Sequence, residues 1–115
     1  MRAAIRCLAV ALFLVVLAPP VGAAEGEAGP SGATQVVRVR VVDFAFRPRN
    51  LTIAHGTVVR WMNRGDVTHT TTSNTGLWGE TLSPGETFRR RFRRIGTFRY
   101  HCTIHTSMTA RITVT

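Results

Sequence analysis

The sequence predicts an all-β domain built as a sandwich or a barrel. From Gln35 onward, short runs rich in β-branched residues are separated by turn signals at regular spacing. No stretch shows a convincing amphipathic helical pattern. The 115 residues allow one domain at most, and seven or eight short strands are enough to bury a two-sheet core.

The strands can be placed from side-chain alternation and from the breaks between runs. We expect strands over residues 36–46, 51–53, 57–62, 69–73, 88–93, 98–102 and 109–115. The clearest breaks, at residues 48–50, 63–66 and 83–86, contain Pro, Gly, Asn or Asp. Residues 94–97 are predicted to form a hairpin connection between the strands on either side.

Residues 1–24 have the three parts of a secretory signal peptide. Arg2 and Arg6 form a basic start, an apolar run covers residues 7–18, and small residues at 21–24 provide a cleavage site. The apolar run is short for a membrane span, so a retained anchor is the less favoured alternative. Residues 25–34 are predicted to form a flexible leader, and residues 35–115 are predicted to form the domain. We expect a periplasmic or secreted protein without stable membrane insertion.

The basic side chains are all arginines, apart from the histidines. Without residues 1–24, thirteen arginines would face six acidic residues, a formal charge of +7. This excess favours an acidic partner or surface, although biased base composition in the source genome would also produce it. No nucleic-acid-binding motif accompanies the charge, so we expect no nucleic-acid partner.

Several arginines fall at informative positions of the predicted strands. Arg89, Arg91 and Arg93 project from one side of their strand, and Arg99 from the corresponding side of its predicted hairpin neighbour. They form either a basic stripe for an acidic partner or a solvated outer face. Arg90 falls on the apolar side, where it must reach water, find a carboxylate or mark a bulge.

Three metal-capable side chains lie within seven residues near the end of the chain: Cys102, His105 and Met108. Removal of the signal peptide would leave Cys102 as the only cysteine of an exported chain, where cysteines are usually paired. Metal binding would explain an unpaired thiol. An intermolecular disulfide and a buried, inert thiol are the alternatives.

A fourth ligand must come from elsewhere in the chain, and His69 is the natural candidate because it opens a Thr-rich strand upstream. Strand alternation places His101 on the face opposite Cys102. His55 lies in an Ala-His-Gly turn, where an exposed histidine is the ordinary interpretation. Imidazole, thiolate and thioether groups together favour copper in both oxidation states, whereas zinc has no use for the methionine.

Several motifs occur in order along residues 36–115. They are Phe46-x-Pro48-x-x-Leu51-Thr52-Ile53, Gly56-Thr57-Val58-Val59-x-Trp61-x-Asn63, His69, Ser83-Pro84-Gly85-x-x-Phe88, and Gly96-Thr97-Phe98-x-Tyr100-His101-Cys102 followed by the short loop to Met108. This string resembles the cupredoxin family of small blue copper proteins, and most of all the amicyanin and plastocyanin group. The two-residue gap between His105 and Met108 is similar to that of amicyanin.

The resemblance implies a Greek-key β-sandwich that holds one type 1 copper ion through His69, Cys102, His105 and Met108. It also implies a monomeric carrier, not an enzyme, that passes single electrons between a donor and an acceptor protein, with His105 near the surface in an apolar patch. A copper storage or delivery protein on the same scaffold is the alternative function. An enzyme with Cys102 as nucleophile is a weaker rival, because no oxyanion-stabilising element is visible.

Two positions depart from the family pattern. Residue 70 is threonine where better-known members have an asparagine that ties the two ligand loops together, and Thr106 stands where proline is common. Thr70 would therefore have to supply any equivalent hydrogen bond near the thiolate. Because such bonds tune a metal site, these changes leave the redox potential open.

Overall fold

The structure is a computed structural model that describes residue 15 and residues 33–115. The predicted signal peptide, apart from Val15, and the predicted leader, apart from its last two residues, lie outside the described residues. None of the described residues forms a helix long and apolar enough to span a membrane.

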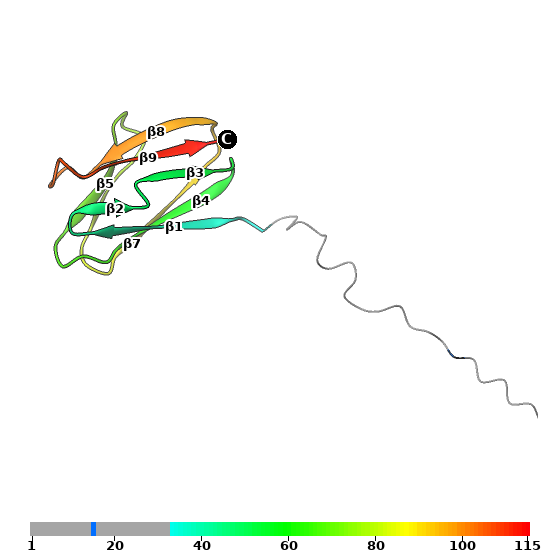
Figure 1. Cartoon of the computed structure of the whole chain (residues 1–115), viewed down its shortest axis with the longest axis horizontal. Helices are drawn as coiled ribbons and strands as arrows, with labels where there is room; N and C mark the ends of the chain where they lie inside the picture. The colour runs from blue at the N-terminus through cyan, green and yellow to red at the C-terminus, as the bar shows by residue number, and fades with distance from the viewer. Residues whose placement is uncertain (1–14, 16–32) are drawn as a thin grey trace, which may run out of the picture. The chain divides into compact units, whose positions relative to one another are not determined.

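Nine strands form two sheets that pack face to face (Figure 1), which confirms the predicted all-β sandwich. One sheet has the order β2-β1-β4-β7 and the other β3-β9-β8-β5-β6. The strands are β1 (Val36–Val42), β2 (Ala45–Arg47), β3 (Asn50–Ile53), β4 (Thr57–Asn63), β5 (His69–Ser73), β6 (Gly79–Leu82), β7 (Thr87–Phe92), β8 (Gly96–His101) and β9 (Thr109–Val114).

Three details of the predicted strand pattern are wrong. Residues 36–46 are not one strand, because the chain turns at Asp43 and Phe44 and β2 folds back antiparallel on β1. Residues 94–97 do not connect a hairpin, since β7 and β8 belong to different sheets. The short strand β6, at the edge of the five-stranded sheet, was not predicted at all.

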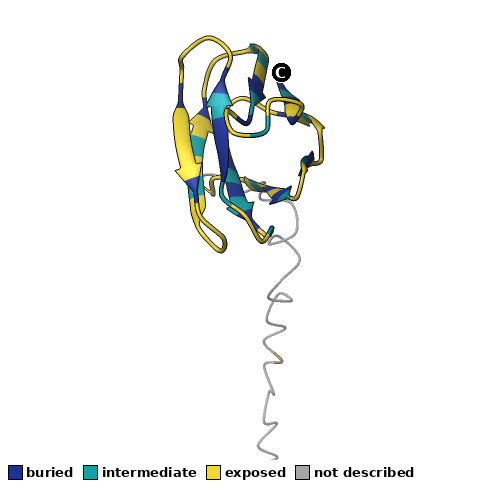
Figure 2. Ribbon diagram, turned by 90° about the vertical axis from the view of Figure 1, so that its left-hand side faces the viewer, coloured by how far each residue is buried: buried dark blue, intermediate teal, exposed yellow. Residues whose placement is uncertain are grey.

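The core lies between the sheets, and buried and exposed residues alternate along most strands (Figure 2). Its centre is an aromatic cluster in which Trp61 contacts Trp78, Phe92 and Tyr100, with ring centroids 5.6–6.3 Å apart. The Arg90 side chain packs against this cluster, with its guanidinium group 5.1 Å from the ring centre of Trp78. Its inward position is thus explained by cation–π contact, without a bulge or a carboxylate.

Asn63, at the end of β4, organises the loop that leads to β5. The side-chain amide is buried and donates hydrogen bonds to the carbonyls of Val67 (2.9 Å) and Leu82 (2.8 Å). Its side-chain oxygen accepts a bond from the Gly65 N–H (2.8 Å). The Asn63 side chain thus provides hydrogen-bond partners for two carbonyl groups and one N–H group in and beside this loop.

We expect Asn63→Ala to destabilise the fold by about 2–4 kcal/mol, because it leaves buried backbone groups without partners. Chemical unfolding of the metal-free protein measures this. Asn50→Ala is the matched control, since Asn50 is exposed and its side chain makes no hydrogen bond within residues 33–115. Equal effects of the two substitutions would contradict this role for Asn63.

Candidate metal centre

Neighbouring strands of one sheet bring the predicted ligands together. His69 is the first residue of β5, and Cys102 directly follows β8, which pairs with β5. His105 and Met108 lie in the loop between β8 and β9, which are antiparallel partners as predicted. Hydrogen bonds from Met108 N to His105 O (2.9 Å) and from Cys102 N to Met108 O (3.0 Å) close this loop.

Three ligand atoms form a compact triangle. His69 Nδ1 and His105 Nδ1 are 3.2 Å apart, and Cys102 Sγ lies 4.0 Å from the first and 3.8 Å from the second. A triangle with these sides has a centre about 2.1 Å from each corner, close to the length of metal–imidazole and metal–thiolate bonds in proteins. One metal ion could therefore reach all three atoms without rearrangement of the chain.

The pocket favours the thiolate form of Cys102. Its sulfur is fully buried and accepts hydrogen bonds from the N–H groups of Thr70 (3.3 Å) and His105 (3.4 Å). Burial by itself raises the pKa of the thiol, but the backbone N–H groups, with His69, outweigh burial and lower the pKa to about 6. A thiolate is the form that binds a metal.

Asp43 orients His69 from the opposite sheet. Its Oδ1 lies 2.6 Å from His69 Nε2, which is hydrogen-bonding distance. An Nε2–H that donates to the carboxylate leaves the lone pair on Nδ1, the atom that faces the triangle. The carboxylate thus selects the tautomer that can bind a metal through Nδ1.

The carboxylate of Asp43 is itself held in place. The Asp66 N–H donates to Asp43 Oδ2 (2.8 Å), and this bond, followed by that of His69, lowers the pKa of Asp43 below its ordinary value. Gly65 passes so close that a Cβ at this position would overlap the carboxylate. Glycine is therefore needed here for space.

Thr70 supplies the link between the two ligand loops. Its Oγ1 accepts a hydrogen bond from the Thr103 N–H (2.8 Å), while its own N–H donates to Cys102 Sγ. The second bond is made by the backbone and does not depend on the side chain. The threonine hydroxyl thus ties the two ligand segments together, and the bond to the thiolate region comes from the Thr70 backbone.

Phe44 forms part of the outer wall of the site. Its ring contacts His105 edge-on at 4.8 Å between centroids and lies 5.9 Å from the ring of His69. The Phe44 side chain is 58% exposed, and Ile104, next to His105, is 52% exposed. The partly buried His105 therefore lies beside exposed apolar side chains.

The other two histidines lie away from the triangle, as expected. His101 Nδ1 is 2.5 Å from Asn74 Oδ1, on the face opposite the buried Cys102. His55 is exposed, with its Nδ1 3.0 Å from the carbonyl of Thr115.

The sequence pattern predicts one continuous strand over residues 36–46, and so it assigns Asp43 and Phe44 no place at the site. An aspartate in the middle of a β-branched run is a poor strand residue and favours a turn. That signal could have located the turn, although its contact with His69, 26 residues away, could not be predicted from local sequence.

Comparison with known proteins identifies the fold family. A model of the cupredoxin-like domain matches residues 6–114 of the sequence. The chain belongs to the cupredoxin-like family. The predicted resemblance to the cupredoxin family is thereby confirmed, with amicyanin as a distant homologue.

Individual relatives of this cupredoxin are similar at low identity. Amicyanin-alpha of Methylorubrum extorquens is 28% identical over 121 residues, which cover 99% of each chain. A purple cupredoxin from Nitrosopumilus maritimus aligns with a TM-score of 0.64 and 26% identity over 69% of this chain and 99% of the other. Oxidised plastocyanin from Dryopteris crassirhizoma shares the fold, with a TM-score of 0.59 and 22% identity over 69% of this chain and all of the other.

The donor set fits copper. Two imidazole nitrogens and a thiolate converge on one point, and the buried Met108 belongs to the same closed loop. Thiolate and thioether favour Cu(I), while imidazole also suits Cu(II). The buried cluster of His69, Cys102, His105 and Met108 is therefore consistent with a type 1 copper site.

We expect Asp43→Ala to weaken copper binding by about 10- to 100-fold, because loss of an outer carboxylate frees the His69 ring and lowers its basicity. Competition against a chromophoric Cu(I) chelator measures this change. Asp66→Ala removes an equal charge nearby and keeps the backbone bond to Asp43, so it should leave the affinity within about twofold. Comparable losses in both variants would show that only net charge matters.

The metal-free protein should titrate at Cys102 with a midpoint near pH 6, well below the ordinary thiol value of 9.0. Thiolate absorbance in the ultraviolet follows this titration. Because the pKa is lower in the folded state, the unfolded chain binds more protons between pH 6 and 9, so this contribution to stability grows with pH across that window and is lost on acidification. Cys102→Ser should remove it, and an unchanged pH dependence of unfolding would contradict the assignment.

Proposed function

We propose that this cupredoxin is an exported single-electron carrier that binds one type 1 copper ion through His69, Cys102, His105 and Met108. The observation that supports this function best is the triangle of His69 Nδ1, Cys102 Sγ and His105 Nδ1. Its three atoms are close enough together to bind one metal ion at its centre. Bound copper would supply the Cu(I)/Cu(II) couple. Met108, on the same loop, would provide the weak thioether ligand of such sites.

The residues around the site favour fast electron exchange. Asp43 and Thr70 hold His69 and the Cys102 loop by hydrogen bonds that do not involve the metal. Ligand positions fixed in this way would change little between oxidation states, which lowers the rearrangement needed for each transfer. Phe44 and Ile104 form an exposed apolar edge beside His105, where a donor or acceptor protein could approach closely.

A carrier explains Cys102 better than an enzymatic nucleophile does. The thiol is 0% exposed, so a substrate could not reach the sulfur without opening the loop. Two backbone N–H groups already point at the sulfur and stabilise its charge in place. We therefore propose that the protein carries electrons without catalysing a reaction of its own.

Addition of Cu(II) to the purified protein should produce an intense thiolate-to-copper absorption band that disappears on reduction and returns on reoxidation over repeated cycles. Cys102→Ser and His105→Ala should abolish the band, because each removes a corner of the triangle. Absorption spectroscopy with simultaneous copper analysis measures both the band and the metal content.

His101→Ala is the matched control for His105→Ala, since His101 is a nearby histidine that faces away from the site. This variant should keep the band. A band that survives in Cys102→Ser would overturn the type 1 assignment. Loss of the copper after one reduction would instead favour a delivery protein on the same scaffold.

A further inference from the structure

The outer face of the sheet β2-β1-β4-β7 is densely covered with arginines. We call this set the arginine face; its members are Arg38, Arg40, Arg47, Arg60, Arg64, Arg89 and Arg91. The outward positions of these four strands contain no acidic residue, and none of the seven arginines forms an ion pair within residues 33–115. The face is thus a patch of one sign of charge.

The strand register places these charges directly opposite one another. Arg60 lies between Arg38 on β1 and Arg89 on β7, and Arg40 pairs with Arg47 on β2. Like charges in opposite positions of a sheet destabilise the pairing. This repulsion occurs in two rows of paired arginines, and no carboxylate on the face offsets it. A loss of stability of this kind is expected where the charges bind an anionic partner.

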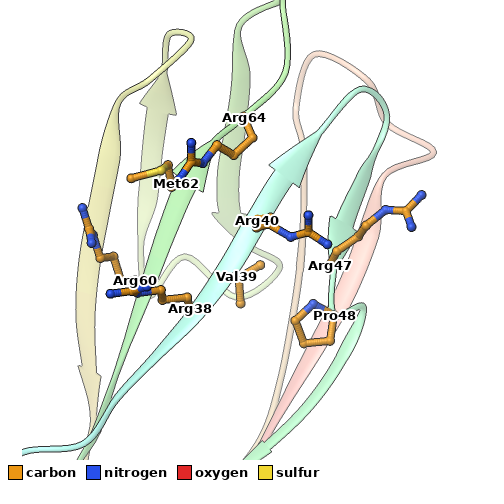
Figure 3. Close-up of a pocket in the computed structure, with 8 residues that line it drawn as sticks. All are labelled: Arg38, Val39, Arg40, Arg47, Pro48, Arg60, Met62 and Arg64. Atoms are coloured by element: carbon orange, nitrogen blue, oxygen red, sulfur yellow. The ribbon is translucent and has the colours of Figure 1, made fainter.

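A groove runs across the arginine face (Figure 3). Five of the arginines line it, together with Met62, Pro48 and residue Val39, whose side chain points into the core; the five are Arg38, Arg40, Arg47, Arg60 and Arg64. Within the described part of the chain, the Nε atom of Arg60 is buried and has no hydrogen-bond partner. Guanidinium groups around a partly apolar floor suit carboxylates presented by a protein surface.

The groove shares a lining residue with a second hollow at the metal end of the fold. Arg47 lines it and also lines a second hollow formed in part by Phe44, Ser107 and Met108. Arg64 is tied to the same end, because its N–H donates to the carbonyl of Val41 (2.7 Å), two residues before Asp43. A partner seated in the groove would therefore also reach the apolar edge beside His105.

We propose that the arginine face is the docking surface for an acidic redox protein, whose carboxylates bind in the groove and place its electron-transfer centre against the Phe44–His105 edge. This inference rests on the proposed electron-carrier function. It replaces the predicted stripe of Arg89, Arg91, Arg93 and Arg99, because Arg99 belongs to the other sheet. A protein partner is favoured over an anionic membrane because a protein can present carboxylates to the groove and a redox centre to the Phe44–His105 edge at once, whereas a lipid surface has no redox centre to present.

The test uses poly-L-glutamate as a carboxylate-bearing probe and the triple variant R40Q/R47Q/R64Q. Wild-type protein should bind the polymer at low ionic strength and release it as salt is added. The triple variant should lose about tenfold or more in affinity. The matched control R93Q/R94Q/R99Q removes the same charge from exposed arginines outside the groove and should stay within about twofold of wild type.

A second measurement links the groove to the metal end. Bound poly-L-glutamate should slow the oxidation of the reduced copper protein by hexacyanoferrate(III) in the wild type and in the control variant, but not in R40Q/R47Q/R64Q. Equal affinity losses in both triple variants would overturn the proposal, since only net charge would then matter. Groove-dependent binding without any slowing would also overturn the proposal, because the bound polymer would then not cover the Phe44–His105 edge.

Vesicles of phosphatidylglycerol and phosphatidylcholine test the membrane alternative. Groove-dependent binding to these vesicles with no binding to poly-L-glutamate would overturn the proposal in favour of a lipid surface. The polymer assay is repeated on metal-free protein, where groove binding should be unchanged. A protein that takes up no copper but still binds the polymer through the groove would refute the electron-carrier function separately.

Discussion

The close approach of His69 Nδ1, Cys102 Sγ and His105 Nδ1 is the constraint on which the metal end of this fold depends. Atoms of this kind, within 4.0 Å of one another and largely shielded from water, need other groups to hold them in place. The Asp43 carboxylate forms a hydrogen bond with Nε2 of His69, the nitrogen that faces away from the triangle. Backbone N–H groups donate hydrogen bonds to the sulfur of Cys102. The site is thus shaped by the chain itself, and a metal would find its ligands already placed.

The contact between Asp43 and His69 also joins the two sheets. Asp43 lies in the turn between β1 and β2, in the four-stranded sheet, whereas His69 begins β5 in the other sheet. Asn63 connects the end of β4 to the carbonyl of Leu82 at the end of β6 in the same way. A change at the metal end would therefore disturb the closure of the sandwich, so metal affinity and fold stability share the same contacts.

The local part of the site could be predicted from sequence, whereas the distant part could not. The loop from Cys102 to Met108 is short, and strand alternation is strict enough to separate His101 from Cys102 without a structure. The role of Asp43 depends on a turn inside a run of β-branched residues and on contact with a residue 26 positions away. The crossing between β7 and β8 was missed for a related reason, since turn residues at 94–97 show that the chain reverses but not which sheet it enters.

The arginines of the arginine face lie beside the metal end and not at the exposed edge next to His105. For the proposed electron exchange, the exposed apolar edge of Phe44 and Ile104 lets a partner approach closely without stripping water from charged side chains. Such an edge is small and offers little to distinguish one partner from another. Under the proposed docking, recognition comes from the neighbouring arginine face, on the sheet whose strands β1 and β2 are joined by the turn at Asp43 and Phe44. Arg47 lines both the groove and the hollow beside Met108, so it is the residue that the charged surface and the metal end have in common.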